Sequence, residues 1–222
     1  MINHLPRATK TLLIINIAIY LLSLLLQELN LISLIATLAS FYPSTANFSL
    51  WQPLTHLFMH ADFAHLFFNM FALYLFGSAV ERILSTKRFL ILYFISGIGA
   101  YLLYMGQSYW LIHPLEEQVR ASGIDLNLIK SHLKLTTMGE LKEFYVPTSE
   151  PLLQLIERYL TPMVGASGAI YGLLIGYLFF FPRAKLFLIF LPVPIEARFF
   201  IPLLLLLEFL LGLFEVSWLP IA

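Results

Sequence analysis

Apolar residues occur along this chain in five long runs that contain few charged residues. The runs cover residues 11–26, 63–80, 89–105, 164–181 and 199–214. A helix needs about 20 mostly apolar residues to cross the hydrocarbon core of a membrane, and tilt or a neighbouring turn extends the shorter runs. The pattern predicts an all-α membrane protein, a polytopic helical bundle with five spans visible.

The composition agrees with this pattern. Of the 222 residues, 59% are apolar and 12% are charged, whereas soluble domains have about 45–50% apolar and about 25% charged residues. A soluble globular protein and a disordered chain are therefore excluded. Thirteen basic and thirteen acidic residues balance, so we expect no nucleic-acid partner. The chain has no cysteine, which excludes disulfides, thiolate metal sites and a cysteine nucleophile.

Basic residues between the runs predict the orientation of the bundle. They precede the first run and lie between the second and third and between the fourth and fifth: Arg7, Lys10, Arg82, Lys87, Arg88, Arg183, Lys185 and Arg198. The segment 30–51, between the first and second runs, has no charged residue. The positive-inside rule then predicts a cytoplasmic N-terminus. We expect a multi-pass protein of the bacterial inner membrane.

The one long polar segment, residues 107–161, lies between the third and fourth runs, on the predicted outer side. Apolar residues at helical spacing predict two short amphipathic helices within it, near 126–135 and 152–160. We interpret the segment as a helical loop insertion in a single membrane domain of residues 1–222. Residues 182–198, which contain three prolines, are interpreted as a connector along the membrane that ends before the fifth run.

A first group of polar residues surrounds the start of the second run. Ionisable groups at membrane depth are costly and are therefore functional candidates. Asp62 suits an N-cap, which leaves His56 and His60 in the preceding loop and places His65 and Asn69 on one helix face. Hydrogen bonding to neighbouring helices is the alternative for these groups. No carboxylate has the spacing of a helical zinc site, so we expect no metal.

A second group lies at the start of the fourth run. Pro162 suits the first turn of a helix, with Thr161 as its cap. This start places Ser167 about five residues into the helix, on one face with Tyr171. A serine at this depth is the candidate nucleophile of the chain.

Glycines crowd around that serine. Gly168, Gly172 and Gly176 form a stripe of the kind that packs helices together in membranes. Helix packing does not account for Gly165 beside Ser167. An open hydroxyl next to accessible backbone N–H groups is what a nucleophile beside an oxyanion hole requires.

Together these two groups resemble the rhomboid family of intramembrane serine proteases. The resemblance covers about residues 14–218 and rests on Trp51, Thr55, His56, His60, His65, Asn69, "GSAVER" at 77–82, "GASGAIYG" at 165–172 and the 181–200 connector. It implies that Ser167 is the nucleophile and that His65 and Asn69 stabilise the oxyanion. The supporting residues that it implies are Gly165, Gly168, Tyr171 and His60, with Tyr171 stacked against the general base.

The resemblance also implies an expected sixth span that carries the base histidine. No histidine follows His132, and the position expected for the base falls just beyond Ala222. The chain as printed is therefore expected to be inactive by itself, because a serine hydroxyl needs a base to lose its proton. The implied partners are single-pass transmembrane protein substrates and the lipid bilayer, with no cofactor.

The alternative function is a catalytically inactive rhomboid-like protein that binds transmembrane clients. A transporter is disfavoured, because neither an inverted repeat nor paired intramembrane charges are present. Two residues stay unexplained at this point. Many family members have Trp-Arg where this chain has Trp51-Gln52, and Glu208 interrupts the fifth run.

Overall fold

The structure is a computed structural model that describes residues 5–133, 149–188 and 191–213. In chain order its elements are α1 (Arg7–Glu28), α2 (Leu34–Leu38), α3 (Gln52–Thr55), η2 (His56–Phe58), α4 (Phe63–Ala72), η3 (Leu73–Gly77), α5 (Ser78–Ala121), α6 (Leu126–His132), α7 (Glu150–Leu160), α8 (Ser167–Phe180), β1 (Lys185–Leu188), β2 (Leu191–Glu196) and α9 (Ala197–Leu213). Helices dominate, which confirms the predicted all-α membrane bundle. By length and composition Arg7–Glu28 and Phe63–Ala121 can each cross a membrane, and α8 is a shorter apolar helix.

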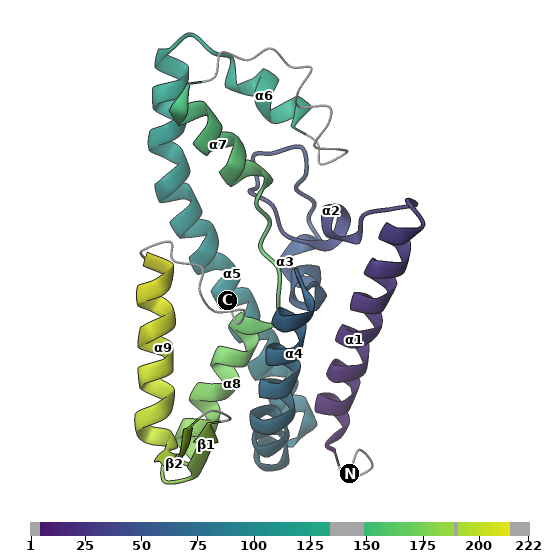
Figure 1. The fold of residues 1–222 in the computed structure, drawn as a ribbon, viewed down its shortest axis with the longest axis vertical. Coiled ribbons are helices and arrows are strands. Elements are labelled where there is room, and N and C mark those ends of the chain that lie inside the picture. The colour runs from purple at the N-terminus through teal and green to yellow at the C-terminus, as the bar shows by residue number, and fades with distance from the viewer. Residues whose placement is uncertain (1–4, 134–148, 189–190, 214–222) are drawn as a thin grey trace.

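The second and third apolar runs form one nearly continuous helical stretch. α4 passes through the π-helical turn η3 into α5. The chain changes direction at Ser85, whose φ of 70° and ψ of 157° interrupt the helix, within the basic segment 82–88. α5 then runs the full height of the molecule to Ala121 (Figure 1), well past the predicted end at residue 105.

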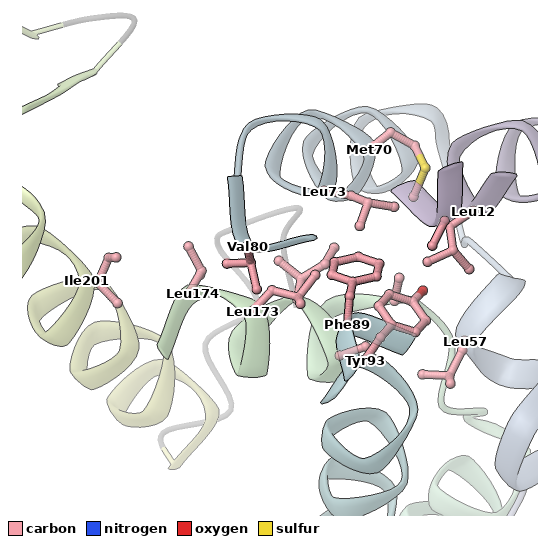
Figure 2. Close-up of a cluster of buried hydrophobic side chains, with 14 of the residues drawn as sticks. Leu12, Leu57, Met70, Leu73, Val80, Phe89, Tyr93, Leu173, Leu174 and Ile201 are labelled. Atoms are coloured by element: carbon pink, nitrogen blue, oxygen red, sulfur yellow. The ribbon is translucent and has the colours of Figure 1, made fainter. Parts of the chain in front are cut away.

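The main hydrophobic core lies where α5 and α8 cross. Figure 2 shows Phe89 and Tyr93 of α5 beside Leu173 of α8, with Leu73 packing over them. These side chains are fully buried. Their contacts fix the position of α8 along its axis relative to α4 and α5, and therefore the position of the candidate nucleophile.

A second, separate core lies at the upper end of the molecule in Figure 1, where α6 and α7 pack against the end of α5. Ile112 and Val119 of α5 are buried there with Leu152 and Leu155 of α7. This burial explains why α5 continues as a helix beyond the membrane-depth run. α6 and α7 are the two short helices that the sequence predicts. Residues 134–148 of the loop lie outside the described residues.

The connector after α8 forms a hairpin that the sequence analysis did not predict. β1 and β2 pair antiparallel, with Lys185 opposite Glu196 and Leu186 opposite Ile195. β2 contains two prolines, at 192 and 194. Proline is tolerated in a two-stranded ribbon because each strand is an edge, on which an N–H that faces away from the partner is not needed. The proline signal therefore marked a break between helices but did not exclude strands.

One glutamate on α5 caps the N-terminus of α1. Glu81 accepts hydrogen bonds from the Ala8 N–H at 2.9 Å, the Thr9 N–H at 2.7 Å and the Thr9 hydroxyl at 2.8 Å. The Thr86 hydroxyl donates to the same carboxylate at 2.8 Å. Among the described residues α1 has no side-chain cap of its own, so a carboxylate distant in sequence satisfies the free N–H groups of its first turn.

Replacing Glu81 by alanine is therefore expected to destabilise the protein by about 3 kcal/mol or more. The change leaves several buried donors without a partner, each of which costs about 1–3 kcal/mol. Thermal unfolding in detergent measures the effect. The matched control is Glu117→Ala at an exposed position of the same helix, which we expect to change stability by less than about 0.5 kcal/mol. Equal melting temperatures for the two variants would contradict this role.

Candidate active site

Asp62 sets the position of the first candidate residues. Its carboxylate accepts a hydrogen bond from the His65 N–H at 2.8 Å and caps α4, as the sequence predicts. His65 and Asn69 follow in the first two turns of α4, on one face, and both are buried. His56 and His60 precede the helix, in η2 and the following loop.

The serine segment is held in place by the chain that precedes α4. The Gly165 N–H donates to the carbonyl of His56 at 3.0 Å. Ser40 and Met163 exchange two backbone hydrogen bonds, at 2.9 and 2.7 Å. The segment that leads into α8 is therefore anchored to the loop at Ser40 and to the turn at His56.

The helix that carries Ser167 begins later than the sequence suggested. Pro162 and Thr161 do not start it; Ala166 is the N-cap and Ser167 is the first helical residue. The reason is Gly165, whose φ of 111° is not helical. Ser167 therefore lies at the positive end of α8, where the N–H groups of the first turn have no partner in the helix, and not one and a half turns inside it.

Gly165 is the point at which the two groups of residues meet. A Cβ built on Gly165 would lie 2.6 Å from His65 Nε2 and 3.7 Å from Ser167 Oγ. The histidine ring and the serine hydroxyl therefore face the same small space, which only glycine leaves open. This close approach accounts for Gly165, which helix packing did not explain.

Several buried polar atoms of the two predicted groups of polar residues have no hydrogen-bond partner among the described residues. They are His56 Nε2, both ring nitrogens of His60, His65 Nε2, Asn69 Oδ1 and the Tyr171 hydroxyl. Asn69 Nδ2 donates to the His65 carbonyl at 2.9 Å, which uses one of its two hydrogens. Unpaired buried polar groups are costly, so His65 Nε2, which borders the space beside Gly165, is available to a polar group bound there.

The ring of His60 packs against that of His65. The two rings lie edge to face with centroids 5.1 Å apart. Burial, followed by the neighbouring His65, lowers the pKa of His60 to about 3, so this ring is neutral at physiological pH. A neutral ring at this distance packs against His65 without repelling it.

Tyr171 lies one turn below Ser167 on α8 and faces α9. Its side chain interacts with that of Glu208, although within the described part of the chain neither the Tyr171 hydroxyl nor Glu208 Oε1 has a hydrogen bond of ordinary geometry. Glu208 therefore faces the serine helix. This position gives the intramembrane carboxyl a neighbour that the sequence alone did not reveal.

The glycine stripe packs α8 against α5. A Cβ on Gly168 would lie 2.4 Å from Ala100 Cβ, and one on Gly172 would lie 1.9 Å from Ser96 Oγ. The two helices approach more closely than any larger residue permits, as the small-residue stripe predicts. This contact holds the N-terminus of α8 at the level of His65.

The buried Gln52 was not recognised from the sequence as part of the site. Its Oε1 accepts from the Phe41 N–H at 3.2 Å and its Nε2 donates to the Asn47 carbonyl at 2.8 Å. The Gln52 carbonyl also contacts His56 Nδ1 at 3.0 Å. Gln52 thus ties the loop 39–50 to the segment that anchors Gly165. In the sequence, the signal for this role was the position of Gln52 next to Trp51.

Comparison with known proteins identifies the relatives of the chain. A family profile described as Rhomboid domain matches residues 47–220. Rhomboid-like protease 3 of Toxoplasma gondii is 34% identical over 100 residues, which are 44% of this chain and 38% of that protein. Rhomboid protease AarA of Providencia stuartii is 31% identical over 113 residues, 48% and 38% of the two chains. Rhomboid protease GlpG of Yersinia pestis is 29% identical over 90 residues, 40% and 31%. The matched segments span about a third of these relatives.

Proposed function

Because this chain belongs to the rhomboid family, several of whose members are named as proteases, we propose that it is an intramembrane serine endopeptidase. It cleaves transmembrane segments of membrane-protein substrates within the bilayer. Ser167 is the nucleophile, and His65 and Asn69 stabilise the oxyanion.

The observation that carries this proposal is the convergence of Ser167 Oγ and His65 Nε2 on the space beside Gly165. When Ser167 attacks a peptide carbonyl, negative charge develops on the carbonyl oxygen. The free N–H groups at the start of α8, the His65 ring and the second hydrogen of Asn69 Nδ2 are the donors available to that oxygen. One such donor is worth about 10²–10³-fold in rate.

Ser167 must lose its proton for this attack. His65 is not assigned that task, since a ring that donates to the oxyanion does not also accept the serine proton. The family resemblance assigns the base to a further span. Activity is therefore to be tested on the full-length protein in its membrane.

The site also supports a topology. The basic residues of the turn at 82–88 and of the hairpin lie at the lower end of the bundle in Figure 1, where α1 begins. α4 and α8 both begin away from that end. With the N-terminus in the cytoplasm of a bacterial cell, the site opens toward the outer side of the inner membrane.

Cleavage in vesicles tests the function. The full-length protein is reconstituted with a single-pass substrate whose transmembrane segment contains glycine and proline, and with a matched substrate whose segment is leucine-rich. We expect mass spectrometry to find two fragments of the first substrate, cut in or near its transmembrane segment, and the second intact. If the first substrate stays uncut but co-purifies with the protein, the protease proposal is wrong and the inactive client-binding alternative is favoured.

A further inference from the structure

A groove opens between α1 and α4, on the side of α4 that faces away from His65. The buried residues of α1 all lie in its first three turns: Ala8, Thr9, Leu12 and Asn16. No residue from 17 to 28 is buried. α1 leans away from α4 toward the upper end of Figure 1, and the space between the two helices has a volume of about 520 Å³.

The walls of this groove are apolar. On α4, Phe63, Phe67 and Phe71 stack along one wall, with successive ring centroids 6.3 and 6.0 Å apart. On α1, Ile14 and Ile17 line the opposite wall, and both are more than 40% exposed. Such a surface matches hydrocarbon.

A single lysine lies at one end of the groove. Among the described residues that line it, Lys10 is the charged one. Within the described part of the chain Lys10 forms no ion pair, and the nearby Glu81 carboxylate is already engaged by Ala8, Thr9 and Thr86. Its ammonium is therefore available to an anion from outside the protein.

The dimensions of the groove select its occupant. From Lys10 to Leu21 α1 rises about 16 Å at 1.5 Å per residue, close to half of the roughly 30 Å hydrocarbon core. An extended acyl chain reaches from the headgroup to the middle of the bilayer, so its length matches that of the groove. The groove therefore accommodates an extended chain one leaflet long, with an anion at the lysine end.

We propose that this groove binds one anionic phospholipid of the leaflet at the basic end of the bundle. Its phosphate pairs with Lys10, and an acyl chain lies along the stacked phenylalanines. The other basic residues at this end, in the turn at 82–88 and the hairpin, attract anionic headgroups to the same surface. The binding does not depend on the proposed protease activity.

Native mass spectrometry of the detergent-purified protein, titrated with phosphatidylglycerol, tests the proposal. We expect one phosphatidylglycerol to bind more tightly than phosphatidylcholine does. Lys10→Ala removes one basic contact with the headgroup and is expected to weaken this binding about fivefold. Ile14→Trp fills the groove, leaves Lys10 in place and is expected to abolish the same binding event.

The control is Lys87→Ala, which removes an exposed lysine from the same end of the bundle but not from the groove. Lys87 contributes only to the general attraction of anionic lipids, so its loss should lower the phosphatidylglycerol affinity clearly less than Lys10→Ala does. The proposal would be overturned if Lys10→Ala and Ile14→Trp bound phosphatidylglycerol as tightly as the unaltered protein does. Equal binding of the two lipids, or a bound peptide in place of lipid, would also overturn it. Melting temperatures within 2 °C of one another (roughly 0.5–1 kcal/mol) ensure that the variants are compared as folded proteins.

Discussion

Alanine at position 167 is expected to abolish cleavage by the full-length protein. Ser167 is the first residue of α8, and its hydroxyl faces the space that His65 Nε2 also borders. Without that oxygen no acyl-enzyme forms, and no negative charge develops for the remaining donors to stabilise. Loss of a serine nucleophile lowers kcat by about 10⁴-fold or more, so we expect no detectable fragments.

The graded control for this result is Asn69→Ala. It removes one proposed oxyanion donor and leaves the nucleophile, so cleavage should fall by about 10²–10³-fold and remain measurable. Fragment formation is followed in vesicles over hours, with equal amounts of each folded variant. Normal cleavage by Ser167→Ala would mean that another residue is the nucleophile. Equal loss of cleavage in both variants would indicate that Asn69 does more than stabilise the oxyanion.

Local signals predicted the first half of this site from the sequence. An aspartate before an apolar run is enough to start α4 at residue 63, because its carboxylate satisfies the His65 N–H within three residues. Once the start is known, helical periodicity places His65 and Asn69 on one face. The same holds for the stripe of Gly168 and Gly172, whose fourfold spacing predicts a close helix contact, and the contact is found with α5.

Contacts between distant segments determined the second half of the site, around Ser167, and the sequence did not reveal these contacts. Pro162 is a good start signal for a helix, but pairing of Met163 with Ser40 and the positive φ of Gly165 delay α8 to Ser167. The role of Glu81 has the same origin, because its partner Ala8 lies 73 positions away. A pattern read along one segment carries no information on such partners.

Gly165→Ala is expected to reduce cleavage about 10³-fold, close to the loss of the nucleophile itself, although it alters no group that takes part in the chemistry. Alanine at a φ of 111° is strained by about 1–3 kcal/mol. Its methyl group would lie 2.6 Å from His65 Nε2, closer than real contacts permit. The strain is relieved when the histidine ring or the serine segment moves, and a displacement of about 1 Å costs about 10²-fold in rate.

Gly99→Ala is the matched control for this change. Gly99 lies in α5, and a Cβ there meets no atom of the described residues within 4 Å, so activity should be unchanged and stability should rise by about 0.5–1 kcal/mol. The measurement is the cleavage rate of both variants beside their melting temperatures. If Gly165→Ala melts only slightly lower yet barely cleaves, the glycine serves the geometry of the site. Full activity in Gly165→Ala would mean that His65 does not need its position beside Ser167, and the oxyanion role of His65 would then be wrong.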